Sequence, residues 1–66
     1  MARVELRELG KGGRTHHLKT TTVAIDGGDE EACVDLLRRM ARQHGRKAGD
    51  CELAVKVGTK TTTYRV

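Results

Sequence analysis

One segment of this chain, and only one, repeats apolar residues at the spacing of an amphipathic helix. Its apolar positions are Ala32, Cys33, Leu36, Leu37, Met40, Ala41 and His44. Asp26 is placed to cap the N-terminus, with Asp29 three residues on in the capping-box position; Asp29 is the alternative cap of a shorter helix. Because Gly45 suits the left-handed conformation that ends many helices, we predict a helix over residues 27–44 or thereabouts.

Two pairs of β-strand patterns flank this helix. Apolar and polar residues alternate there with the period of two that is typical of half-buried strands. The predicted strands cover approximately residues 2–9, 17–25, 51–57 and 61–66. With 66 residues and Tyr64 as the only aromatic residue, the chain has enough apolar side chains for one thin core. We therefore predict a single α+β domain over residues 1–66, in the order ββαββ, with one helix packed on a four-stranded sheet.

A ββαββ chain of this length fits the β-grasp arrangement, in which the first and last strands lie parallel at the centre of a mixed sheet. The layout resembles the small immunoglobulin-binding domains of bacterial surface proteins, including a Thr-rich second strand that runs through Ala24, Ile25 and Asp26 into the helix. The resemblance implies a β-grasp-like fold with the second and third strands at the edges, and it implies no antibody binding. A different strand order, or strand pairing between two chains, remains open.

Positive and negative charges are segregated along the sequence. The net charge is +4, and the basic residues cluster in segments 11–19 and 38–47, with an acidic block at 26–35 between them. In the β-grasp arrangement the loop after the first strand and the loop after the helix lie at the same end of the sheet. We therefore expect one basic pole, with an acidic pole opposite.

The basic pole predicts binding to nucleic acid or another polyanion. The candidate anion-binding residues are Lys11, Gly12, Gly13, Arg14, His16, His17, Lys19, Arg42, Arg46 and Lys47. The glycine amides are suited to an anion-binding nest, and the hairpin tip is suited to insertion into a groove. Because Tyr64 is the only aromatic residue, stacking of single-stranded bases is not expected. The alternative explanation is that the basic helix end complements the helix dipole and that the charges keep a small domain soluble.

The second functional hypothesis is a protein-interaction module, either an adaptor or an inhibitor, with an acidic protein surface as its partner. It would use the outer sheet face or an edge strand, as a monomer or as a homodimer. The expected outer face consists of Arg3, Glu5, Arg7, Leu18, Thr20, Thr22, Ala24, Glu52, Ala54, Lys56, Thr61, Thr63 and Arg65. This mixture is also typical of a solvated face.

No motif indicates catalysis, a cofactor or a metal. The segment Gly10–Gly13 lacks the Lys-Ser/Thr ending of a phosphate loop and leads into a strand. His16, His17, His44 and Cys51 could approach one another at the basic pole, and nitrogen and sulfur ligands suit zinc. The neighbouring cations and the absence of a C-x-x-C pair disfavour such a site, and the two cysteines are expected to be separate core thiols. We therefore expect a non-enzymatic, cytoplasmic protein without cofactor, metal or membrane segment.

Overall fold

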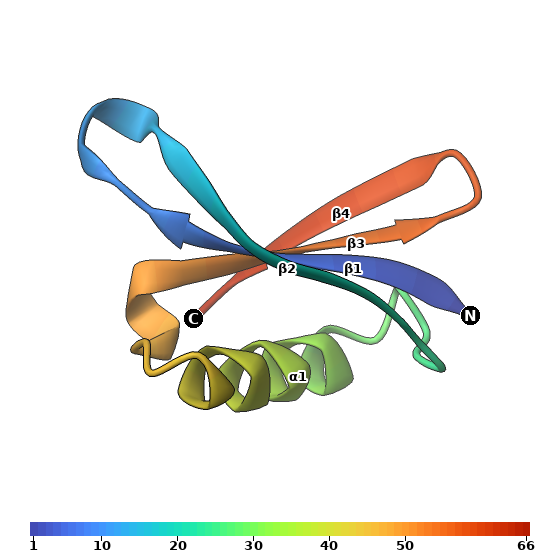
Figure 1. Cartoon of the computed structure of the whole chain (residues 1–66). Helices are drawn as coiled ribbons and strands as arrows, with labels where there is room; N and C mark the ends of the chain where they lie inside the picture. The colour runs from blue at the N-terminus through green and yellow to red at the C-terminus, as the bar shows by residue number, and fades with distance from the viewer.

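A computed structural model describes residues 1–66 and shows one α-helix packed against a four-stranded sheet (Figure 1). In chain order the elements are β1 (Ala2–Leu9), the 3-10 helix η1 (Lys11–Gly13), β2 (Thr15–Val23), α1 (Glu30–Gln43), the 3-10 helix η2 (Ala48–Asp50), β3 (Cys51–Val57) and β4 (Lys60–Arg65). α1 covers one face of the sheet, and the opposite, outer face is uncovered. The chain is therefore a small α+β domain.

The strand order is β2-β1-β3-β4, and every neighbouring pair is antiparallel. The expected β-grasp order, with its mixed sheet and parallel first and last strands, is wrong. The connection that follows α1 brings Cys51 beside Glu8, at the end of β1, so β3 runs back along β1 in the opposite direction. β3 is the more apolar of the two C-terminal strands and takes the central place. The Thr-rich β4 lies at the edge, so the edges are β2 and β4 and not the second and third strands.

α1 begins later than the expected residue 27. The side chain of Asp29 caps it by accepting a hydrogen bond from the Ala32 N–H at 3.1 Å, so the alternative cap is confirmed and the preferred cap, Asp26, is wrong. Asp26 instead accepts the Gly28 N–H at 2.9 Å in the turn ahead of the helix. Two consecutive glycines explain the delay, because glycine loses the most backbone entropy when it enters a helix.

The core lies between α1 and the two central strands. Its fully or almost fully buried members are Ala2, Val4, Leu6, Cys33, Leu37, Met40, Ala41, Cys51, Leu53 and Val55. At the edge of this core, the Tyr64 hydroxyl on β4 donates a hydrogen bond of 2.5 Å to the carbonyl oxygen of Gly27. This bond ties the edge strand to the loop that leads into α1.

A β-bulge changes the pairing of β2 with β1. Leu6 lies opposite Lys19 whereas Arg7 lies opposite His17, which leaves Leu18 as the additional residue. Leu18 was expected on the outer face, but it is half-buried and packs against the core. Bulges increase the local twist, and the β1–β2 hairpin curls away from α1 in Figure 1. Ala24, also expected on the outer face, lies beyond the end of β2.

Candidate functional site

The two basic stretches lie at the same end of the molecule. β1 and α1 end there and β3 begins there (Figure 1). One ion pair connects the second stretch to the end of β1, which precedes the first stretch: Nε of Arg46 lies 3.0 Å from Oε2 of Glu8. The acidic start of α1 is at the opposite end, and the 14 residues of the helix separate the two ends by ~21 Å. The two basic stretches thus share one end of the molecule, which we call the common end, as the sequence predicted, although the sheet is antiparallel and not mixed.

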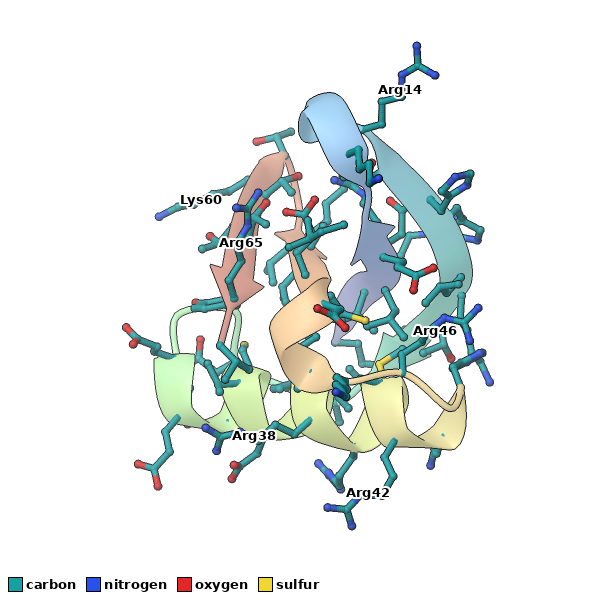
Figure 2. All side chains as sticks on the ribbon, turned by 90° about the vertical axis from the view of Figure 1, so that its left-hand side faces the viewer. Arg14, Arg38, Arg42, Arg46, Lys60 and Arg65 are labelled. Atoms are coloured by element: carbon teal, nitrogen blue, oxygen red, sulfur yellow. The ribbon has the colours of Figure 1, made fainter.

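The basic end contains two separate groups and not one continuous patch. Figure 2 views this end, with Arg14 at the tip of the β1–β2 hairpin, Arg42 on α1, and Arg46 between them. We call residues 10–19 the hairpin arm, and we call Arg42, Arg46 and Lys47 the helix-end group. The twist of the β1–β2 hairpin carries the tip of the hairpin arm away from the helix-end group.

The tip of the hairpin arm is a tight turn with exposed cations. The N–H of Gly10 donates a hydrogen bond of 2.7 Å to the carbonyl oxygen of Arg14 and closes the turn. Gly12 and Gly13 have φ angles of 70° and 77°, in the left-handed region that favours glycine. Lys11 and Arg14 are exposed, and neither forms an ion pair with an acidic residue. The tip therefore presents two cations that no contact within the fold neutralises.

Several other predicted residues take part in contacts within the domain. His17 is directed to the outer sheet face, where its Nδ1 lies 2.7 Å from Oε2 of Glu5. Arg46 pairs with Glu8 and also donates a hydrogen bond of 3.3 Å to the His44 carbonyl. Lys19 lies on the edge strand β2 and is exposed. It is paired with the core residue Leu6 of β1, so it lies on the α1 side of the sheet. The predicted Lys and Arg residues without an ion pair are therefore Lys11, Arg14, Lys19, Arg42 and Lys47.

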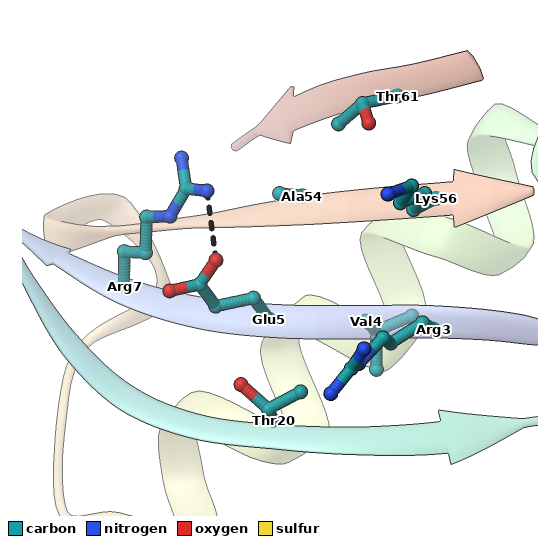
Figure 3. A pocket seen from close by; sticks show the side chains of 8 residues that line it. All are labelled: Arg3, Val4, Glu5, Arg7, Thr20, Ala54, Lys56 and Thr61. Atoms are coloured by element: carbon teal, nitrogen blue, oxygen red, sulfur yellow. Dashed lines mark hydrogen bonds and ion pairs between the residues drawn. The ribbon is translucent and has the colours of Figure 1, made fainter. Parts of the chain in front are cut away.

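The outer face of the sheet has a hollow that the sequence did not indicate. It has a volume of about 330 Å³, and its lining residues are Arg3, Val4, Glu5, Arg7, Thr20, Ala54, Lys56 and Thr61 (Figure 3). Ala54 forms its floor and is only 4% exposed, and its neighbour on the same face, Glu52, is 5% exposed. Both residues were expected on the outer face, and both lie there, but the longer side chains around them bury them. A short side chain between long ones on a central strand is the signal that could have indicated the hollow.

An ion-pair network borders this hollow and centres on Glu5. Nη2 of Arg7 lies 2.8 Å from Oε1 of Glu5, and Nδ1 of His17 lies 2.7 Å from its Oε2. The hydrogen bond from Arg7, followed by the one from His17, lowers the pKa of Glu5 from 4.5 to about 2. The same contact with Glu5 raises the pKa of Arg7. Glu5 is therefore ionised at neutral pH, and both of its oxygens are engaged.

This network predicts a specific loss of stability in acid. Because the folded-state pKa of Glu5 is lowered, its contribution is complete above pH 4.5 and disappears as the pH falls to about 2. Since the side chain is 31% exposed, we expect a contribution of about 1–2 kcal/mol, below the value that the full pKa shift would give. Denaturant unfolding of the wild type and of Glu5→Gln, from neutral pH down to about pH 2, measures it. The free energies of unfolding should differ most at neutral pH and converge near pH 2; a constant difference would contradict the prediction.

The two cysteines are free, and both are buried in the core. Burial raises the pKa of the Cys33 thiol and of the Cys51 thiol, which keeps them protonated and poorly nucleophilic. No three or more His, Cys, Asp or Glu side chains come close enough together to hold a metal ion. α1 is too short and too polar to cross a bilayer.

The common end and the outer face each carry exposed cations. The common end includes the projecting tip of the β1–β2 hairpin, and the outer face has the hollow whose floor is Ala54. No protein-family model, no curated protein and no solved structure matches the chain.

Proposed function

We propose that this protein is a non-enzymatic nucleic-acid-binding module that contacts the phosphate backbone with its hairpin arm. The proposal rests on Lys11 and Arg14, which are exposed at the tip of the arm and form no ion pair with an acidic residue. They contribute nothing to the core, which lies between α1 and the central strands. Uncompensated cations at a projecting tip are well suited to a polyanion.

The shape of the arm supports contact with a duplex. Lys and Arg side chains that neutralise phosphates release condensed counterions, and this release drives binding largely without regard to sequence. The arm forms the end of the β1–β2 hairpin, and a two-stranded β-ribbon is an element that the major groove of DNA can admit. Gly12 and Gly13 have no side chains, so the backbone at the tip can approach a phosphate closely.

The helix-end group is the secondary contact in this proposal. Arg42 lies in the last turn of α1, where a cation also stabilises the negative end of the helix dipole. Arg46 is held by Glu8, so reversing its charge would place two acidic groups together and disturb the fold. Variants of the arm therefore test the proposal more cleanly than variants of the helix end.

The decisive comparison is between two variants of equal net charge. In the first, Lys11→Gln and Arg14→Gln are combined; in the second, the control, Arg38→Gln and Lys60→Gln are combined at exposed sites away from the arm. For a generic DNA or RNA duplex, we expect the arm variant to lose about tenfold or more in affinity. Its plot of log K against log salt should also become shallower by about 2, because two phosphate contacts are lost. Fluorescence anisotropy over a series of salt concentrations measures both quantities.

The control variant should retain most of the affinity and the full salt dependence. Equal losses in both variants would show only a response to net charge and would contradict a role for the arm. Failure of the wild type to bind any duplex at low salt would contradict the proposal as a whole. An acidic protein that stays bound at high salt, in the absence of duplex binding, would favour the interaction module instead.

A further inference from the structure

The geometry points to a second binding site, in which the hollow on the outer sheet face holds the phosphate group of a phosphate monoester. The hollow lies across the central strands β1 and β3, away from the tip of the hairpin arm. It shares no residue with the anion-binding set predicted from the sequence. The inference is therefore independent of the proposed binding to nucleic acid.

Two like charges face each other on the central strands. Arg3 on β1 lies directly opposite Lys56 on β3, and both side chains are exposed on the outer face. Like charges in this position destabilise a sheet, and neither residue is within ion-pair distance of an acidic group. Figure 3 shows them on one side of Ala54, with the paired Glu5 and Arg7 on the other side. A bound anion would remove this repulsion.

The acidic residues on the same face are already engaged with other cations. Glu5 is held by Arg7 and His17, as described above. The oxygens of Glu52 lie 3.6 Å from Arg65 and 4.0 Å from Arg7. The outer face therefore has two positive charges without an acidic partner, those of Arg3 and Lys56.

This surplus of two charges selects a dianion. A phosphate monoester carries about −1.5 to −2 at neutral pH, whereas a phosphodiester or a carboxylate carries a single charge. A guanidinium can also donate two parallel hydrogen bonds to phosphate oxygens, and an ammonium adds a compact charge. Arg3 and Lys56 together supply this combination.

Hydroxyl groups and free space complete the site. Thr20 on β2 and Thr61 on β4 line the hollow from its two sides. The Thr61 hydroxyl can donate to a phosphate oxygen, and the Thr20 hydroxyl also lies 3.5 Å from Nε2 of His17. Ala54, the shortest side chain that lines the hollow, forms its floor between the longer side chains. A volume of about 330 Å³ has room for a phosphate and part of the group esterified to it.

The test compares three small anions on the folded protein. We expect methyl phosphate to shift the amide NMR signals of Arg3, Ala54 and Lys56 in a saturable manner. Dimethyl phosphate and acetate, each with one charge, should bind at least about tenfold more weakly. Equal affinity for all three anions would overturn the assignment to a phosphate monoester, and strongest shifts at the hairpin arm would overturn the location.

Single substitutions then identify the groups that bind. Arg3→Gln and Lys56→Gln should each reduce the affinity for methyl phosphate by about tenfold, because each removes a charged donor. Lys60→Gln is the matched control, since Lys60 has no ion pair and does not line the hollow. Unchanged affinity in Arg3→Gln and Lys56→Gln, with dispersed spectra that show an intact fold, would overturn the inference. The variant of Lys11 and Arg14 should bind methyl phosphate normally, so failure of one site is distinguishable from failure of the other.

Discussion

Replacement of Leu37 by alanine is expected to lower the free energy of unfolding by about 3 kcal/mol. Leu37 lies on the buried face of α1, is 0% exposed, and is among the largest fully buried side chains. The variant loses the transfer free energy of the removed atoms and leaves a cavity between the helix and the central strands. The core has no Phe or Trp that could move into this space. A domain of this size has a total stability of only about 3–10 kcal/mol, so the loss is a large part of it.

Urea unfolding followed by circular dichroism measures this effect. The matched control is Leu36→Ala, which removes the same atoms from the adjacent position on the same helix, where the side chain is only half-buried. We expect the control to cost less than half as much, since less apolar surface leaves water in the native state. Equal costs at the two positions would contradict the orientation of α1 on the sheet.

The orientation of the helix and strands was predictable because it depends on local periodicity. The apolar stripe of α1 and the alternation of β1 and β3 place Leu37, Val4 and Leu53 on buried faces, and all three are 0% exposed. The strand order was not predictable in this way. Alternation tells which side chains face the core, but it does not tell which strand is the neighbour. Both C-terminal strands alternate, and only their difference in apolar content favours β3 at the centre.

The two candidate sites also differ in whether the sequence predicts them. The common basic end was predictable, because its residues lie in or beside the connections that follow β1 and α1. The opposed pair of Arg3 and Lys56 was not, because it requires the pairing of β1 with β3 across most of the chain. The contact of His17 with Glu5 depends in addition on the bulge at Leu18, which places His17 opposite Arg7. Contacts between distant segments and irregularities in a strand leave no periodic signal in the sequence.

A methyl group at Gly27 should destabilise the domain by about 1–3 kcal/mol. A Cβ built at this position would lie 2.9 Å from Cγ2 of Val57 and 3.6 Å from Cγ1 of Val55. The φ angle of Gly27 is not positive, so the cost of Gly27→Ala comes from steric overlap and not from backbone strain. The loop also cannot move away freely, because the Gly27 carbonyl accepts the hydrogen bond from the Tyr64 hydroxyl. For a domain of this size we expect the melting temperature to fall by about 4–8 °C for each kcal/mol.

Two further variants separate steric overlap from a general effect of alanine in this loop. Gly28→Ala places its Cβ 3.5 Å from Oδ1 of Asp26, an ordinary contact, and it should be neutral or slightly stabilising because alanine restricts the unfolded chain. In the double variant Gly27→Ala with Val57→Ala, the overlapping methyl group is absent. Val57 is 45% exposed, so its own truncation costs little, and the double variant should regain much of the stability. If Gly27→Ala and Gly28→Ala had the same effect, or if the truncation of Val57 gave no relief, the close approach of β3 to the loop ahead of α1 could not be the reason for glycine at position 27.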